Sequence, residues 1–122
     1  MPKKTLLAVA SLAAALAVAA AAPAARTASP TLIGTVGPGF TITLKMNNKV
    51  VKTLKAGTYT LVINDKASIH AFSLDGPNGF AKDFTTVPFV GTKTFTVTLK
   101  PGAYKYYCPP HEPSMFGRFI VK

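Results

Sequence analysis

The sequence predicts an all-β domain, a Greek-key β-sandwich of seven to eight strands, behind an N-terminal leader. Two observations predict this fold. From residue 31 onward, apolar and polar residues alternate with a period of two, which is typical of half-buried strands. Turn residues interrupt the alternation at short intervals, and no long window after residue 30 shows the 3.6-residue period of a helix. Seven or eight short strands in about 90 residues indicate two packed sheets.

The alternation can be followed element by element. The apolar residues that share one face are Phe40, Ile42 and Leu44, then Tyr59, Leu61 and Ile63, then Phe95, Val97 and Leu99. Turns are predicted at Gly37-Pro38-Gly39, Asn47-Asn48, Ala56-Gly57, 76–79, Gly91 and Pro101-Gly102. Tyr104, Tyr106 and Cys108 fall on one face of the penultimate strand, and His70, Phe72 and Leu74 share another. The last strand is expected over residues 117–122.

Residues 1–24 have the layout of a secretory signal peptide. Lys3-Lys4 is a short positive segment, residues 5–22 are almost all apolar, and Ala22-Pro23-Ala24 offers a small-residue cleavage site. An uncleaved membrane anchor is the alternative, since about 18 apolar residues just span a bilayer. Weakly hydrophobic alanine favours cleavage. Residues 25–30 are then a linker and residues 31–122 the domain. We expect export to the periplasm, the cell surface or the medium.

The chain is strongly basic. It has 14 Lys and Arg against 4 Asp and Glu, and removing Lys3 and Lys4 with the leader leaves 12 against 4, a net charge of +8. This charge fits an acidic redox partner or an anionic membrane surface, and it equally serves solubility alone. Scattered basic residues and export argue against nucleic acid. We expect a monomer, with peripheral or anchored membrane association left open.

The chain has one cysteine, and its neighbours explain it. An exported domain usually has cysteines in pairs, so a single thiol suggests an intermolecular bond, a reactive site or a metal ligand. Cys108, His111 and Met115 put a thiolate, an imidazole and a thioether within eight residues, and His70 lies about forty residues upstream. Two His, one Cys and one Met are the ligand set of a blue-copper electron-transfer site.

These residues resemble those of the cupredoxins, the plastocyanin, amicyanin and pseudoazurin group, over essentially the whole chain after the leader. The motif is His70 in Ile69-His70-Ala71-Phe72, followed by Tyr106-x-Cys108-x-Pro110-His111-x-x-x-Met115. The resemblance implies one copper ion, with His70, Cys108 and His111 as equatorial ligands and Met115 as the weak axial one. The Cys-to-His spacing matches plastocyanin and amicyanin. The His-to-Met spacing of three lies between amicyanin's two and plastocyanin's four.

Two positions depart from the pattern of this family. Ala71 stands where the family usually has Asn, and Pro109 stands where it usually has Ser or Thr. Pro109 and Pro110 have no N–H, so we expect the Cys108 sulfur to receive at most one amide hydrogen bond, from Ala71. Fewer such bonds leave more negative charge on sulfur, which favours Cu(II) and lowers the reduction potential.

Each ligand also has a simpler structural role, since a lone buried His or Met is most often core packing. Structural zinc prefers four strong ligands, and a binuclear copper centre needs a second cysteine. A Cys–His nucleophile would need a cleft and an orienting acid. We therefore expect no enzyme and no small-molecule substrate, but a one-electron carrier between redox partners. Copper delivery or storage is the alternative, and a metal-free structural sandwich is a third possibility.

Overall fold

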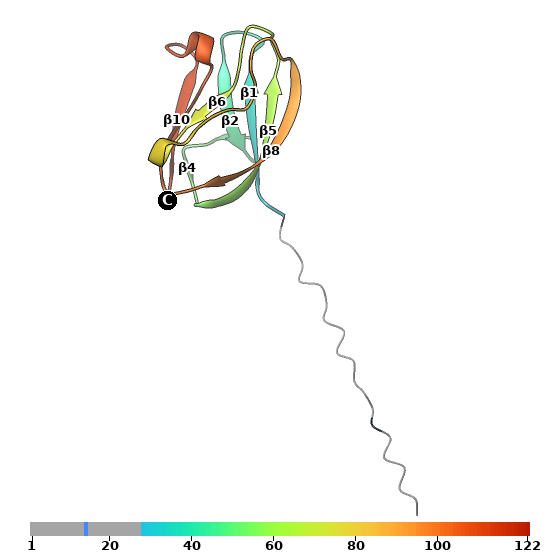
Figure 1. The fold of residues 1–122 in the computed structure, drawn as a ribbon, viewed down its shortest axis with the longest axis vertical. Coiled ribbons are helices and arrows are strands. Elements are labelled where there is room, and N and C mark those ends of the chain that lie inside the picture. The colour runs from blue at the N-terminus through green and yellow to red at the C-terminus, as the bar shows by residue number, and fades with distance from the viewer. Residues whose placement is uncertain (1–13, 15–27) are drawn as a thin grey trace, which may run out of the picture.

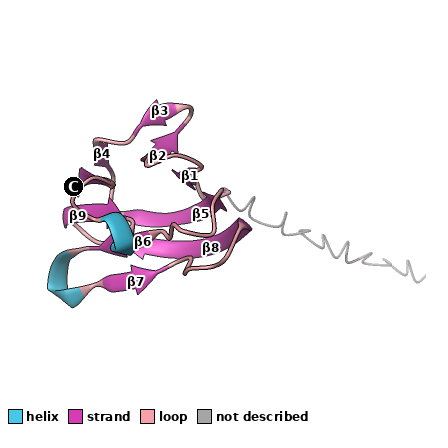
Figure 2. Ribbon diagram, turned by 90° about the horizontal axis from the view of Figure 1, so that it is seen from above, coloured by secondary structure: helices cyan, strands magenta, loops and turns pink. Residues whose placement is uncertain are grey.

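The computed structural model describes Ala14 and residues 28–122. The signal peptide or anchor predicted for residues 1–24, Ala14 apart, and the first part of the linker predicted for 25–30 lie outside the described residues. In the described part of the chain, no helix is long and apolar enough to cross a membrane. Strands and loops make up this part, apart from two short helical turns (Figure 2).

The described residues form ten strands in two sheets (Figure 1). In chain order they are β1 (Thr31–Val36), β2 (Ile42–Met46), β3 (Lys49–Val50), β4 (Thr53–Leu54), β5 (Gly57–Asp65), β6 (Ser73–Asp75), β7 (Ala81–Asp83), β8 (Gly91–Leu99), β9 (Gly102–Tyr107) and β10 (Phe116–Val121). One sheet has the order β3-β2-β1-β5-β8, and the other has the order β4-β10-β9-β6-β7. The predicted count of seven to eight strands is wrong, because two-residue strands such as β3 and β4 are too short to alternate visibly.

Both sheets are mixed. β1 lies parallel to β5, with Leu32 opposite Leu61, and β4 lies parallel to β10, with Leu54 opposite Val121. The other strand pairs are antiparallel. The parallel pairs join segments far apart in the sequence. The last strand, β10, thus pairs with β4, which precedes β5 in the chain.

The core lies between the two sheets and follows the predicted alternation. Along β5 the residues Tyr59, Leu61 and Ile63 are all buried, and along β8 Val97 and Leu99 are buried. The second sheet contributes stacked aromatic rings, with the centroids of Tyr104 and Phe119 5.1 Å apart. Burying side chains of this size contributes about 1.5–3 kcal/mol each, so the apolar stripes hold the two sheets together.

Gly34 in β1 makes room for the segment that carries His70. A Cβ at Gly34 would lie 2.7 Å from the Ile63 side chain and 2.8 Å from the Phe72 ring. Real Cβ atoms do not come this close, so only glycine fits here. The missing side chain lets Phe72, two residues after His70, pack under β1.

One end of the sandwich gathers the residues singled out from the sequence. The register puts the ends of β1 and β5 together in one sheet, and the end of β9 beside the start of β10 in the other. The contact between His70 and His111 brings these two places to the same end of the sandwich. The helical turn η2 (Pro109–His111) lies at this end, at the top of Figure 1. The turn η1 (Pro77–Gly79), the C-terminus and the first residues of the domain lie toward the other end (Figure 1).

Candidate metal centre

Cys108 marks the point where β9 ends and a tight loop begins. It is fully buried, and its N–H donates to the carbonyl oxygen of Met115 at 3.0 Å, which ties the two ends of the loop together. Within the loop, the N–H of His111 donates to the Cys108 carbonyl oxygen at 3.0 Å. Pro109 and Pro110 fix two φ angles of η2. The loop is therefore shaped by its own backbone.

His70 reaches the same place from the turn between β5 and β6. Its N–H donates to the Ala67 carbonyl oxygen at 3.1 Å, and its side chain is completely buried. Gly37 allows this position, because a Cβ there would lie 3.0 Å from the His70 Cδ2 atom. Gly37 also has a φ of 77°, which glycine adopts without strain.

Three donor atoms meet at this end. The Cys108 Sγ atom lies 3.7 Å from His70 Nδ1 and 3.6 Å from His111 Nδ1, and the two nitrogens are 3.2 Å apart. The centre of this triangle lies about 2.0 Å from each corner, which equals a metal–imidazole bond and is about 0.3 Å short of a metal–thiolate bond. A single first-row metal ion, slightly nearer the nitrogens, fits this triangle.

The thiol sulfur receives one backbone hydrogen bond among the described residues. The Ala71 N–H donates to Cys108 Sγ at 3.4 Å, as predicted. Cys108 is also the N-cap residue of η2, and its side chain makes no capping hydrogen bond. A cap side chain normally accepts from the second or third helical residue. The second is Pro110, which has no N–H, and the N–H of His111 is used by the Cys108 carbonyl.

Comparison with known proteins identifies the fold. No family model matches the chain. Among solved structures, rusticyanin, described as a copper protein, matches at 21% identity over 75% of this chain and 76% of that chain, with a TM-score of 0.55. Rusticyanin from Thiobacillus ferrooxidans matches at 25% identity over 75% of this chain and 76% of that chain, with a TM-score of 0.50. A reduced mutant of amicyanin matches at 16% identity over 80% of this chain and 88% of that chain, with a TM-score of 0.52. Both are cupredoxins. The fold is that of a cupredoxin.

The cupredoxin fold and the donor triangle agree on the metal. His70, Cys108 and His111 offer two imidazoles and one thiolate within 4.8 Å of one another. This donor set, in this fold, is that of a single type 1 copper site. Met115 is buried at 1% exposure, and its carbonyl oxygen is the partner of the Cys108 N–H. The backbone of Met115, the predicted fourth residue, therefore lies beside the backbone of Cys108.

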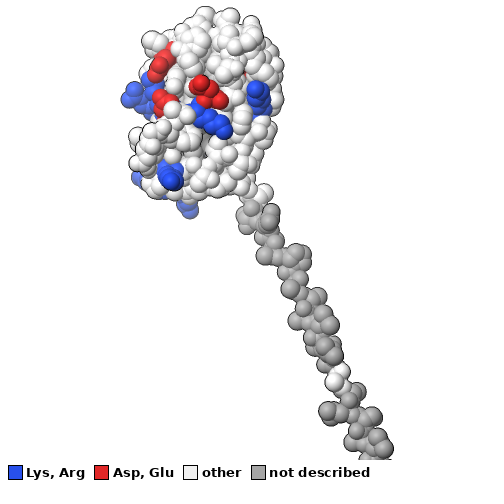
Figure 3. Space-filling view, viewed as in Figure 1, with Lys and Arg blue, Asp and Glu red and all other residues white. Residues whose placement is uncertain are grey.

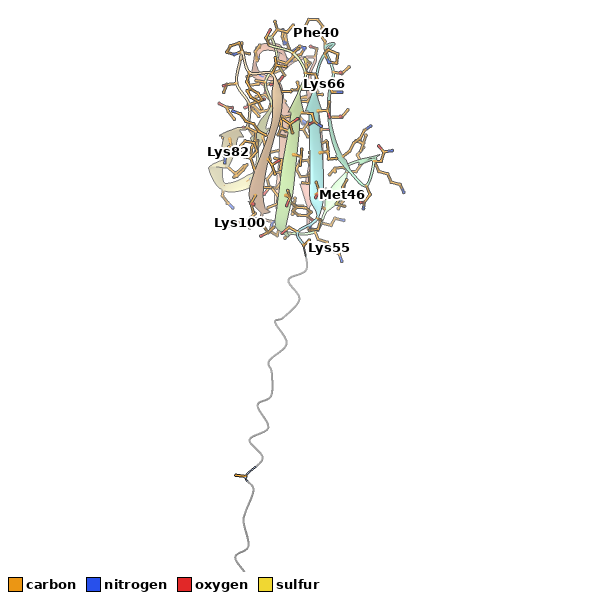
Figure 4. All side chains as sticks on the ribbon, turned by 90° about the vertical axis from the view of Figure 1, so that its right-hand side faces the viewer. Phe40, Met46, Lys55, Lys66, Lys82 and Lys100 are labelled. Atoms are coloured by element: carbon orange, nitrogen blue, oxygen red, sulfur yellow. The ribbon has the colours of Figure 1, made fainter. Side chains whose placement is uncertain are left out.

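Phe40 is the site residue that the alternation misplaces. It was expected on the core face with Ile42 and Leu44, but it is 61% exposed, because it precedes β2 and follows the turn at Gly37. Its ring meets both imidazoles edge to face, with centroids 5.4 Å from His70 and 4.9 Å from His111. Phe40 lies at the extreme end of the sandwich in Figure 4. The ring thus covers the metal centre of this cupredoxin fold from the solvent side.

The far side of the His70 ring is held by packing. Among the described residues, neither His70 Nε2 nor the buried Asp65 Oδ2 has a hydrogen-bond partner. A metal-bound histidine usually donates its second N–H to a carboxylate or carbonyl group. Here the Phe40 ring packs edge to face against the His70 ring.

The two tyrosines that precede Cys108 at the end of β9 have raised pKa values. Burial raises the pKa of Tyr106, and burial, together with the Asp75 carboxylate that accepts its phenol hydrogen bond at 3.2 Å, raises the pKa of Tyr107 to about 12. Glu112, within the loop, is paired with Lys105 at 2.9 Å. Both phenols are therefore uncharged near neutral pH.

Proposed function

We propose that this protein is an exported, mononuclear type 1 copper protein that carries single electrons between redox partners. The observation that carries the proposal is the buried triangle of one sulfur and two nitrogens, closed by backbone hydrogen bonds at one end of a cupredoxin fold. His70, Cys108 and His111 would hold the copper ion, with the Met115 thioether as a weak fourth ligand. Copper in such a set alternates between Cu(II) and Cu(I) and so exchanges one electron.

The side chains around the site suit electron exchange. Cys108 and His70 are sealed from water, which keeps the local dielectric low and limits solvent rearrangement. Pro109, Pro110 and the loop hydrogen bonds hold the donors in one geometry for both oxidation states. A site that changes little on gaining an electron exchanges it quickly.

His111 provides the exit for the electron. It is only partly buried, whereas the other two donors of the triangle are fully buried. Exposed apolar side chains lie at the same end, among them Phe40 at 61%, Ile69 at 51% and Phe116 at 45% exposure. With Pro110 and Pro113 they form a small apolar surface for brief docking of a redox protein. The net positive charge favours an acidic partner.

The same arrangement argues against catalysis. All three donors face one another across a space the size of one ion, and two of them are fully buried. Ligation by these residues and a thioether leaves no open position for a substrate. We therefore infer that the protein is a carrier and not an enzyme.

The proposal includes export, by way of the segment before the domain. Residues 1–24 act as the signal peptide or anchor, residues 25–30 as the linker and residues 31–122 as the copper domain. Support comes from the Lys3-Lys4 pair, the apolar run that follows and the Ala22-Pro23-Ala24 cleavage site.

One experiment separates electron transfer from copper delivery. The protein is loaded with one equivalent of Cu(II), cycled with ascorbate and ferricyanide, and then challenged with a Cu(I) chelator. We expect full recovery of the oxidised spectrum over repeated cycles, with copper kept against the chelator, because the donors are buried. Loss of Cu(I) to the chelator within one cycle would instead establish delivery and contradict the proposal.

A further inference from the structure

The positive charge is concentrated at the end of the sandwich opposite the metal centre. We call this surface the basic end, and its residues are Lys45, Lys49, Lys52, Lys55, Lys100 and Lys122. The strand register places these residues around the last residues of β2, β8 and β10 and the short strands β3 and β4. Figure 4 shows Lys55 and Lys100 at the end opposite Phe40.

No acidic residue of the described chain lies at the basic end. Asp65 and Glu112 belong to the metal-centre end, and Asp75 and Asp83 lie on β6 and β7. In Figure 3 the acidic atoms lie in the upper half of the molecule, while basic atoms reach its lowest part. The positive charge is therefore concentrated at one end of the long axis of the domain. Lysines without acidic neighbours attract an anionic surface.

The basic end also has a hollow with an apolar wall. It has a volume of about 400 Å³ and lies between the β2–β3 hairpin and β4. Met46, Val50 and Leu54 contribute apolar surface, while Lys49 and Lys52 are exposed beside them. Val50 is 45% exposed. Apolar side chains next to ammonium groups suit an amphipathic anion, such as a phospholipid with its phosphate and glycerol region.

The chain enters the domain at this same end. The carbonyl oxygen of Pro30 accepts the N–H of Thr60 at 2.9 Å, which fixes the residue before β1 near the start of β5. The preceding sequence contains the apolar run of residues 5–22. A leader that enters a bilayer, whether during export or as an anchor, therefore brings the basic end to the membrane first. This connection favours a lipid surface over an acidic protein as the partner of the lysines.

We propose that the basic end binds an anionic phospholipid bilayer, with a lipid phosphate between Lys49 and Lys52, while the metal centre faces away from the membrane. Each lysine close to an anionic membrane strengthens binding about five-fold. In this orientation the apolar surface around Phe40 stays free for a redox partner. The proposal goes beyond the copper function and does not depend on it, since no donor of the metal site takes part.

Vesicle sedimentation of the full chain tests the proposal. One vesicle type is phosphatidylcholine alone, and in the other roughly one lipid in three is phosphatidylglycerol. We expect binding to rise with phosphatidylglycerol and to fall in high salt. The variant K49Q/K52Q/K55Q should lose about 100-fold of the phosphatidylglycerol-dependent binding. The control K66Q/K82Q/K93Q has the same charge change elsewhere and should keep it, while thermal unfolding confirms that both variants fold.

Three results would overturn the proposal. Equal losses in the two triple variants would show that net charge, not its location, attracts the protein. Equal binding to vesicles with and without phosphatidylglycerol would assign any membrane association to the leader alone. No phosphatidylglycerol-dependent binding, together with lysine-dependent binding to an acidic protein, would make the basic end a protein-docking surface.

Lysine acetylation tests the orientation. Vesicle-bound protein is treated briefly with acetic anhydride, and each lysine is measured by mass spectrometry against the free protein. We expect Lys49, Lys52 and Lys55 to be protected several-fold on vesicles, while Lys66 and Lys93 react as they do in solution. Equal protection of both sets, or of neither set, contradicts the orientation.

Discussion

Replacing Pro110 with alanine should give the Cys108 thiolate a hydrogen bond that the natural sequence denies it. Cys108 caps η2, and Pro110 is the second residue of that turn, the position whose N–H normally meets a cap side chain. Proline supplies no N–H, so the sulfur accepts only from Ala71, at 3.4 Å. Alanine keeps the φ angle available and restores the missing donor.

The expected effect is a higher reduction potential. Sulfur is a weak acceptor, so the new bond is taken at the low end for charged acceptors, about 1.5 kcal/mol. The reduced site holds one more electron, and its sulfur is the more negative one, so the bond favours reduction. For one electron, 1.4 kcal/mol corresponds to about 59 mV. Because the oxidised site also accepts this bond, only the difference in bond strength changes the potential, which should rise in Pro110→Ala by at most about 60 mV.

The measurement is cyclic voltammetry of the copper-loaded protein. Pro109→Ala is the matched control, because it restores an N–H at the first position of the turn, which does not meet a cap side chain. The control should keep the natural potential. A fall in the potential of Pro110→Ala, or an equal rise in the control, would refute the account of the thiolate hydrogen bonds. Thermal unfolding checks that losing a proline costs no more than about 1 kcal/mol.

Three further predictions concern single side chains. Phe40→Ala should lower the reduction potential, because it admits water beside both imidazoles. Phe116→Ala is the control and should keep the natural potential, because its ring is not among those in contact with the two imidazoles. Voltammetry compares the two variants. Met115→Leu should raise the potential, because it removes a fourth donor, and Cu(I) tolerates three-fold coordination better than Cu(II) does. Met46→Leu in the distant hollow should leave the potential unchanged. An unchanged potential in Met115→Leu would exclude Met115 as a ligand. Gly34→Ala should destabilise the fold by about 1–3 kcal/mol, because its Cβ meets Ile63; urea unfolding measures this loss, and natural stability would contradict the packing described.

Alternation predicted most of the buried strand faces, and soft-ligand chemistry singled out the residues that the structure brings together. The buried residues of β5, including Leu61, follow the period of two, because one face of each strand packs against the other sheet. Parity also predicted that Cys108 points inward at the end of β9, where it is fully buried. The meeting of His70 with Cys108 and His111 rested on the family resemblance, and the structure brings all three together.

What the sequence could not predict depends on long-range geometry. The parallel pairs β1–β5 and β4–β10 join distant segments, and alternation is the same for either strand direction. The position of Phe40 was predicted wrongly because the two-residue alternation applies only within a strand. Phe40 precedes β2, and Gly37 turns the chain before that strand begins. The concentration of lysines such as Lys55 and Lys100 at one end is invisible in a linear count, where the basic residues look scattered.

The visible spectrum of the Cu(II)-loaded protein tests the central claim most directly, measured beside Cys108→Ser. The account predicts one copper ion per chain and an intense thiolate-to-copper absorption band, because the Sγ atom lies in the donor triangle with both Nδ1 atoms. Cys108→Ser should lose the band and keep its fold. Copper bound without the intense band, or a band that survives in Cys108→Ser, would contradict the account.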